Sequence, residues 1–305
     1  MTMEIYYQGT DITSLVHTRK CIVRDTAGER CDSIDVVFDD AAGWMRWGPR
    51  EDESIRIRRG GYDSGDMYIV NVVPEDSYYR IIAASLPCRA RAQGYGSYYK
   101  KTLEEIMRSC AALSGMDFKL YGIDGKTEIP YIERDNEGCA AFLSRLLALE
   151  GAALKCVNGR YAAIGYDYAQ ARKAVQTMPM EPGKALYCRS GETYRGITVK
   201  TPHTSASAED LSVPVSHAWL TTGRLPALTN VQAGRWARGE LYRLNRACEH
   251  VLAESDFNSS MTAMVRVDIE CTGDENGTWL VESAEHDLVD LKTKVILRRC
   301  IDSIR

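Results

Sequence analysis

The chain has 305 residues, 45% of them hydrophobic and 26% charged, which is enough for two or three folded units with ordinary hydrophobic cores. Its 38 basic and 42 acidic residues leave a formal charge of -4, too weak a field to favour nucleic acid or an anionic membrane as a partner. The sequence opens without a basic and apolar leader and has no run of about 18 apolar residues. We therefore expect a product made in the cytoplasm, with no nucleic-acid binding site and no membrane insertion.

Residues 1–97 favour β-strands separated by tight turns. Short runs alternate polar and apolar residues or are rich in β-branched residues, which suits a half-buried sheet. Between the runs, Gly and Asp supply the positive φ that hairpin turns need. The pattern predicts a first β-barrel over 1–97, with strands at 21–24, 33–38, 54–58, 67–73 and 78–84.

Residues 98–182 predict a small α+β insert. Apolar residues recur at three- and four-residue spacing over 101–114, ahead of Gly115, which is typical of an amphipathic helix that ends at a glycine. A second helix is expected to begin after Asp135 or Asn136, either of which can cap it, and to stop at Gly151. We predict strands at 117–121, 153–157 and 160–165, the last two joined by a hairpin at Asn158-Gly159.

Residues 183–305 return to strand-like sequence and predict a second barrel segment interrupted by a long helix. Apolar residues over 230–254 fall on one helical face, and the Ser-, Thr- and Pro-rich stretch 201–214 predicts an exposed loop. The fold class that follows is mainly β with an α+β insert, in which two similar β-barrel domains flank the insert. The remaining strands of this part are expected at 184–189, 191–200, 262–271, 277–287 and 292–300.

The cysteines and histidines give no pattern of a metal site or of a nucleophile. Ten cysteines are scattered without a CxxC pair, so we interpret them as reduced and mostly buried small hydrophobes. His286, between Glu285 and Asp287, has the neighbours that a proton-transfer group needs, but the favoured interpretation is a strand-end histidine in a hydrogen-bonded turn. We therefore expect no catalytic residues, no cofactor and no metal.

Aromatic residues are the candidate partner-binding positions. Trp44 and Trp47 lie near a Gly-Pro pair and either anchor a neighbouring chain or close the first barrel. Tyr95, Tyr98 and Tyr99 belong to the stretch 90–99, which we interpret as a flexible connector. Tyrosine is enriched at protein contacts, although core packing would explain these residues equally well.

Several stretches of the sequence, together with this layout, resemble one family. The segment Tyr131-Ile132-Glu133-Arg134-Asp135-Asn136-Glu137, followed by the helix at 141–146, is the most characteristic of them. Similar likenesses occur at 25–40, 61–65, 101–106, 230–237, 279–286 and 293–299. They are similar to the late-control protein D family, the baseplate hubs of P2-like and Mu-like phage tails. One departure is that Asp135-Asn136-Glu137-Gly138 stands where the family often has Glu-Ser-Asp.

The resemblance implies a structural, non-enzymatic hub in the baseplate of a virion or a tail-like bacteriocin particle, assembled in the bacterial host cytoplasm. It implies a homotrimer whose barrels form a ring that adapts a trimeric spike protein to a hexameric tail tube or its tube-initiator protein, with baseplate wedge proteins as further partners. The alternatives are a tail-associated cell-wall hydrolase, of which no motif is visible, and the hub of another contractile injection system.

Overall fold

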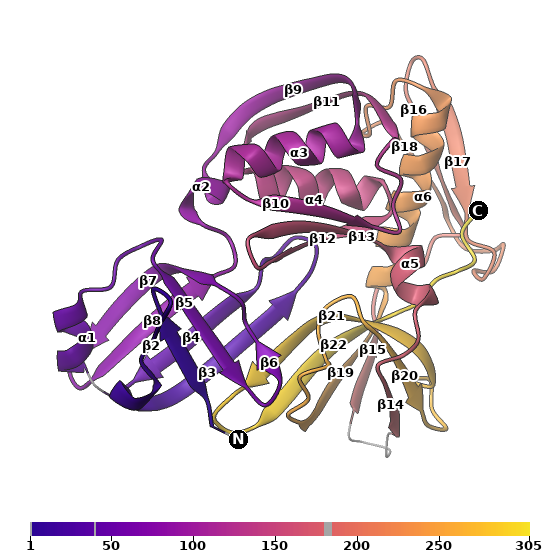
Figure 1. Cartoon of the computed structure of the whole chain (residues 1–305). Coiled ribbons are helices and arrows are strands. Elements are labelled where there is room, and N and C mark those ends of the chain that lie inside the picture. Colours follow the sequence, from indigo (N-terminus) through magenta and orange to yellow (C-terminus); the bar gives the residue numbers. More distant parts are fainter. Residues whose placement is uncertain (1, 40, 180–184) are drawn as a thin grey trace.

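The computed structural model describes residues 2–39, 41–179 and 185–305. A long, mainly antiparallel β-sheet runs along one side of the molecule, and an α+β unit lies above it (Figure 1). Among the described residues, no helix combines the length and apolar character needed to cross a membrane.

The N-terminal half of the long sheet forms from the strand pattern expected for 1–97. In β8 (Tyr78–Ala84), Tyr79, Ile81 and Ala83 are buried and the residues between them are partly exposed, so one face packs on a core and the other does not. We call this part the first half-sheet. Its other elements are β1 (Glu4–Tyr7), β2 (Thr10–Asp11), η1 (Thr13–Leu15), β3 (Thr18–Thr26), β4 (Ser33–Phe38), α1 (Ala41–Trp47), β5 (Ser54–Arg59), β6 (Tyr62–Asp63) and β7 (Met67–Glu75).

The C-terminal strands form the second half-sheet, which continues the first edge to edge. Strand β21 (Gly277–Asp287) pairs antiparallel with β3, from Ser283 opposite Thr26 to Asp287 opposite Ile22. The predicted strand 277–287 is confirmed, and the predicted strand 292–300 is β22, one residue shorter. The other strands are β14 (Gln176–Pro179), β15 (Ala185–Arg189), β19 (Glu249–Asp256), β20 (Arg266–Glu270) and β22 (Lys292–Arg299); Lys184 of the predicted strand 184–189 lies outside the described residues.

The two half-sheets do not close into the two separate barrels expected from the sequence. The described strands of the two half-sheets form one 14-stranded sheet whose main path is open and ends at β15 and β2. The physical reason is that a strand can pair along two edges only. Strand β3 pairs with β4 on one edge and with β21 on the other, so it has no free edge with which to close the first half-sheet. The mainly β character is confirmed and barrel closure is corrected.

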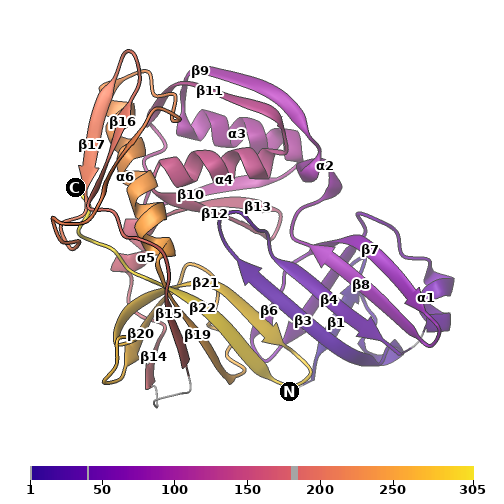
Figure 2. The same cartoon turned by 180° about the vertical axis from the view of Figure 1, so that it is seen from behind.

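The α+β insert is a three-layer unit. Helices α3 (Leu103–Ser114) and α4 (Cys139–Leu149) lie between a two-stranded ribbon, β9 with β11, and a three-stranded sheet of β10, β13 and β12 (Figures 1 and 2). The connector predicted at 90–99 is wrong, because Gly94–Thr102 pairs with β11. The other elements are α2 (Cys88–Arg91), β9 (Gly94–Thr102), β10 (Asp117–Tyr121), β11 (Glu128–Glu137), β12 (Ala152–Val157), β13 (Arg160–Gly165) and α5 (Tyr166–Ala171).

Local signals explain where these helices begin and end. Thr102 and Glu105 form a reciprocal capping box at the start of α3, and Gly115 ends it at φ 67°. The predicted cap of α4 is wrong: β11 extends through Asp135 and Asn136, and the N-cap is Gly138, which has no side chain to donate or accept. The Asn158-Gly159 hairpin is confirmed, since both residues adopt positive φ.

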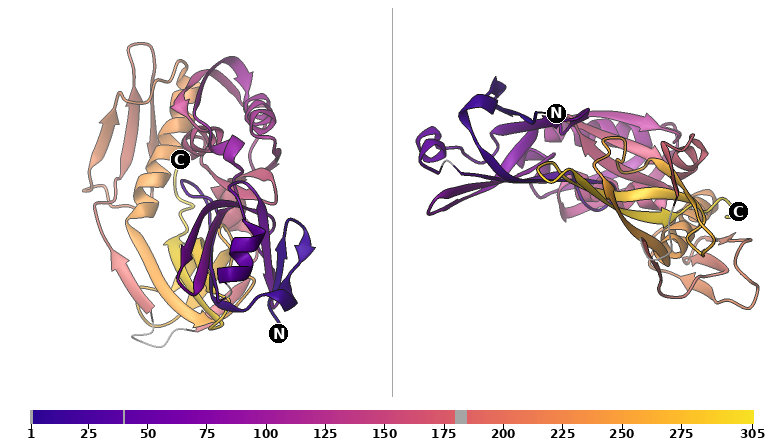
Figure 3. Two further views of the ribbon diagram at one scale, coloured as in Figure 1. Left: turned by 90° about the vertical axis from the view of Figure 1, so that its left-hand side faces the viewer. Right: turned by 90° about the horizontal axis from the view of Figure 1, so that it is seen from below.

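Beside the α+β unit lie helix α6 (Asn230–Ala247) and a small sheet of β16 (Gly196–Lys200), β17 (Ser205–Glu209) and β18 (Trp219–Thr222). In Figure 3, α6 stands between this sheet and the α+β unit. The predicted helix 230–254 is too long, because after Ala247 the burial pattern changes to period two, with Val251 and Ala253 inward and Leu252 outward in β19. The loop predicted at 201–214 contains β17.

A buried ionic cluster ties the three main parts together. Lys155 on β12 donates to Asp25 at 2.7 Å and to Asp32 at 3.0 Å, and both aspartates belong to the first half-sheet and its β3–β4 turn. Asp25 also accepts at 2.6 Å from the backbone N–H of Ala263, in the turn between β19 and β20 of the second half-sheet. All three ionic side chains are buried. Because buried charges need partners, this triad fixes how the α+β unit sits on the sheet.

Replacing Lys155 by Met is expected to lower the free energy of unfolding by about 3 to 5 kcal/mol, because two buried carboxylates lose their cation. Chemical denaturation measures the loss. The matched control is Lys20→Met: Lys20 also pairs with an aspartate, Asp35 at 3.2 Å, but its side chain is 48% exposed. That change is expected to cost less than about 1 kcal/mol. Equal losses in the two variants would contradict the structural role given to the triad.

Candidate functional site

Trp44 and Trp47 lie together on α1, at one end of the first half-sheet. Trp44 is fully buried, with its ring 4.5 Å from that of Phe38. Trp47 is 39% exposed, covers Trp44 at a centroid distance of 4.9 Å and stacks with Tyr7. Of the two, Trp47 therefore presents aromatic surface to the outside, and Trp44 supports it from the core.

Tyr95, Tyr98 and Tyr99 lie on the β9–β11 ribbon and divide between its two faces. Tyr98 points inward and stacks on Phe142 of α4 at 5.4 Å. Tyr95 is 72% and Tyr99 is 65% exposed. Tyr131, 38% exposed, is directly opposite Tyr99 in the ribbon. The outer face of the ribbon thus carries three tyrosines. Tyr131 was not among the partner-binding residues predicted from the sequence, because strand register decides which residue lies opposite Tyr99.

His286 is a core residue of the second half-sheet. Its Nε2 lies 3.0 Å from the carbonyl oxygen of Met261, which can only accept, so Nε2 carries the proton. Its Nδ1 then accepts from the hydroxyl of Thr293 at 3.0 Å. Burial lowers the pKa of His286, which keeps the ring neutral. Both ring nitrogens are occupied by structural hydrogen bonds, and the ring does not form an ion pair with Glu285 or Asp287.

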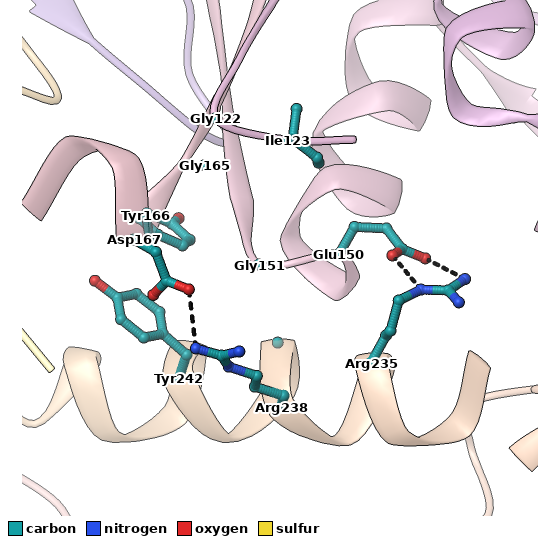
Figure 4. A pocket seen from close by; sticks show the side chains of 11 residues that line it. Gly122, Ile123, Glu150, Gly151, Gly165, Tyr166, Asp167, Arg235, Arg238 and Tyr242 are labelled. Atoms are coloured by element: carbon teal, nitrogen blue, oxygen red, sulfur yellow. Dashed lines mark hydrogen bonds and ion pairs between the residues drawn. The ribbon is translucent and has the colours of Figure 1, made fainter. Parts of the chain in front are cut away.

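A pocket of about 190 Å³ lies where α6 meets the ends of α4 and β13 (Figure 4). Four glycines bring the backbone close to the pocket: Gly122, Gly151, Gly165 and Gly239. Arg238 forms an ion pair with Asp167 across the pocket at 2.9 Å. Its side-chain lining also includes Ile123, Glu150, Tyr166, Arg235 and Tyr242.

Glu150 is the anchor of this pocket. Its side chain is 3% exposed and accepts from Arg235 Nε at 2.8 Å and from Trp236 Nε1 at 2.8 Å, both on α6. An arginine therefore holds each of the two carboxylates of the pocket, Glu150 and Asp167. This arrangement joins α6 to the α+β unit. Within the described residues, no group of three or more His, Cys, Asp or Glu side chains is placed to hold a metal ion.

Sequence reasoning placed Arg235 and Trp236 in a characteristic stretch but did not connect them with Glu150. They are separated by about 85 residues along the chain, and nothing in local periodicity indicates that α6 docks on the end of α4. The usable signal was Gly239 in the middle of a helix, where glycine is unfavourable unless backbone must approach closely.

Substituting Gly239 by Ala is expected to destabilise the docking of α6. A Cβ at Gly239 would lie 2.2 Å from the carbonyl oxygen of Leu149, which is backbone and cannot rotate away. The control is Gly234→Ala in the same helix, where the nearest atom would be the Ala206 Cβ at 3.8 Å, an ordinary contact. Gly234→Ala should stabilise by about 0.5 to 1 kcal/mol through helix propensity. Thermal unfolding of both variants tests whether their effects have opposite signs.

Comparison with known proteins shows the fold. The structure matches a 43 kDa tail protein of prophage MuSo2 from Shewanella oneidensis with TM-score 0.74 and 12% identity, over 100% of this chain and 99% of that one. It matches a tail protein from Neisseria meningitidis MC58 with TM-score 0.75 and 11% identity, over 98% and 96% of the two chains. A type VI secretion component of E. coli, described as structurally similar to the T4 tail proteins gp27 and gp5, matches with TM-score 0.56 and 10% identity, over 96% and 76%.

No protein-family model and no curated protein sequence matches the chain. The structural matches cover 96% or more of the chain, so the chain has the fold of these phage-tail and type VI secretion proteins.

Proposed function

We propose that this chain is a structural baseplate hub of a contractile phage tail or of a tail-like bacteriocin particle, and that it acts as a homotrimer without enzymatic activity. The observation that carries the proposal is the edge-to-edge junction of two half-sheets within one chain, through β3 and β21. The proposal divides the chain as 1–97, 98–182 and 183–305, with the middle part as an insert.

The junction suggests how copies join. The main path of the sheet ends at β15 on one side and β2 on the other, and free strand edges are suited to pairing with another chain. Three chains joined at such edges would place six half-sheets around one axis. A ring of that kind has true threefold and approximate sixfold symmetry, which is what a connector between a trimeric spike protein and a hexameric tail tube needs.

The charged face of the sheet fits a water-filled ring. Asp35 on β4 pairs with Arg80 at 2.7 Å and with Lys20 at 3.2 Å, and Arg24 bridges the half-sheet junction to Glu285 at 2.9 Å. All of these side chains except Asp35 are about a third or more exposed. Ionic networks of this kind lose stability when they are buried without compensation, so this face is better suited to a solvent-filled lumen than to a dry contact.

Aromatic side chains supply the proposed contacts with other baseplate proteins. We assign Trp47, Tyr95 and Tyr99 to direct contact and Trp44 and Tyr98 to their support, since aromatic anchors dominate interface energies. The partners proposed are the spike, the tail tube or tube-initiator protein and the baseplate wedge. The likeness to the E. coli type VI secretion component keeps one second candidate, the hub of another contractile injection system.

The first test is absolute mass by light scattering during gel filtration, for the chain alone and with its spike. We expect a trimer, or a monomer that forms a three-to-three complex with the spike; a monomer that does not bind the spike contradicts the proposal.

Leu186→Asp is expected to weaken self-association by at least tenfold. Leu186 is 59% exposed on the edge strand β15, so the variant would place a charge in the contact between chains. Leu113→Asp, at a leucine on α3 that is 47% exposed, is the control and should leave the mass unchanged.

The double variant Tyr95→Ala and Tyr99→Ala is expected to weaken binding of a baseplate partner by about 10- to 100-fold, the loss expected for interface aromatic residues. Its midpoint of thermal unfolding should stay unchanged, because both side chains are mainly exposed. Calorimetric titration with spike and with tube-initiator subunits measures the loss. Tyr168→Ala, at a tyrosine on α5 that is 37% exposed, is the control. Unchanged affinity for both partners would remove the ribbon from the list of contacts.

A further inference from the structure

The small sheet of β16, β17 and β18 has one face that points away from the rest of the described chain. Helix α6 packs on the other face, where Ile197 and Val199 of β16 are fully buried. Because side chains alternate along a strand, Gly196 and Thr198 lie on the opposite, outward side, which Figure 3 shows beyond α6. Strand register places the other residues of this outer face beside them: Glu209, Ser207, Ser205, Lys200, Trp219 and Thr221.

Trp219 lies flat across this outer face. It is directly opposite Gly196 in the pairing of β18 with β16, and a Cβ at Gly196 would lie 2.5 to 2.7 Å from three neighbouring carbons of the indole. Because these carbons are nearly equidistant from that position, the indole turns its face, and not its edge, toward Gly196. Its Nε1 donates to the Thr198 hydroxyl at 2.8 Å, which fixes the rotation of the ring. Trp219 is nevertheless 48% exposed, so the other side of the ring is open to solvent.

Hydroxyl groups border the ring. Thr198, which holds the indole nitrogen, is paired with Ser207 on β17 and with Thr221 on β18, and both of these residues are exposed. The hydroxyl oxygens of Thr198 and Ser207 are 2.8 Å apart. Since the Thr198 oxygen accepts from Trp219, its own proton is available for Ser207, which leaves the Ser207 proton for a molecule outside.

The charges of the outer face are few. Its acidic residue, Glu209, is paired with Arg195, which donates to Oε1 at 2.5 and 2.8 Å, and its basic residue is Lys200. A single-stranded nucleic acid needs a positively charged groove beside an aromatic ring, and one lysine does not supply it. The aromatic anchor of a protein interface is ringed by contacts that exclude water, whereas Trp219 is bordered by hydroxyls. Both kinds of partner fit this face poorly.

We propose that the outer face of the small sheet binds a neutral saccharide, with one sugar ring stacked on Trp219. A pyranose ring has hydroxyls at its rim and C–H groups on its faces, and the slightly positive C–H groups are attracted by the negative face of an aromatic ring. The sugar hydroxyls would exchange hydrogen bonds with Ser207 and Thr221. They would also donate to Oε2 of Glu209, since the described bonds from Arg195 both go to Oε1.

The ring is held in place before a ligand arrives. Because Gly196 and Thr198 already fix Trp219, stacking a sugar on it costs little further ordering. One open ring without enclosing walls should bind a single sugar weakly, and a chain of sugars more tightly, because the chain offers several rings to the same indole. The inference rests on the small sheet alone and does not depend on the proposed hub function.

The experiment is calorimetric titration of the full chain with three neutral hexasaccharides, cellohexaose, chitohexaose and maltohexaose. We expect at least one of them to bind. Trp219→Ala should weaken that binding by about tenfold or more, the loss typical of an aromatic anchor, and Trp219→Phe should retain part of it. Trp47→Ala removes the other exposed tryptophan and is the control, with unchanged affinity expected.

Gly196→Ala tests the geometry without removing any group that touches the sugar. The new Cβ would displace the indole from its place on the sheet, so binding should fall about as far as in Trp219→Ala. The midpoint of thermal unfolding should stay close to that of the wild type, because the displaced ring lies at the surface.

The titration of the wild type needs no variant, and failure of all three hexasaccharides to bind overturns the inference. Binding that Trp219→Ala leaves unchanged also overturns it. So does a lower mass of Trp219→Ala in solution, because the face would then be a contact between copies of this chain. Tighter binding of a single-stranded hexanucleotide than of any hexasaccharide would assign the face to nucleic acid instead.

Discussion

The triad of Lys155, Asp25 and Asp32 determines how the parts of the molecule are arranged. Burial raises the pKa of Asp32 to about 7, with repulsion from Asp25 adding to the rise and Lys155 opposing it. The folded state therefore binds a proton at Asp32 more tightly than the unfolded state does, and this group's contribution to stability falls as pH rises from about 4 to 7. At neutral pH the ionised Asp32 is thus held at a cost, whereas the two aspartates, acting against burial, raise the pKa of Lys155 and stabilise its charged form. The triad contributes specificity to the arrangement of the α+β unit on the sheet. Two apolar surfaces can pack in several shifted positions, whereas two carboxylates, one ammonium and the Ala263 amide satisfy one another in one arrangement only.

That constraint makes the long sheet a usable building block. The pairing of β3 with β21 joins the two ends of the chain, and a two-stranded contact alone is weak and free to twist. The triad sits at the end of this junction, where Asp25 is itself opposite Ala284. The α+β unit therefore braces both half-sheets from above, and α6 is fixed to that unit in turn by Glu150. The proposed hub needs its edges held at a defined angle, and each of these buried polar contacts fixes part of that geometry.

The sequence predicted local structure well and closure poorly, for physical reasons. The strands 33–38, 78–84, 117–121, 160–165 and 277–287 and the helix α3 follow from alternation, capping and turn residues, which act over a few positions. The end of α6 was misplaced because 249–254 satisfies a helical face as well as a strand, and pairing with β22 decides between them. Two barrels were expected because each part consists of short strands separated by turns, and because the family resemblance implied two similar barrels, but a strand pattern does not say which edges pair. Likewise, the sequence around Trp44 and Trp47 does not show which ring is buried, and only packing against Phe38 distinguishes the buried ring from the exposed one.

The buried polar clusters share one design, a single charged group surrounded by donors or acceptors from different segments. Glu150 accepts from two α6 side chains, and Lys155 donates to two aspartates. Both clusters lie at seams between units, where carboxylates and amines are chemically inert and serve as permanent contacts.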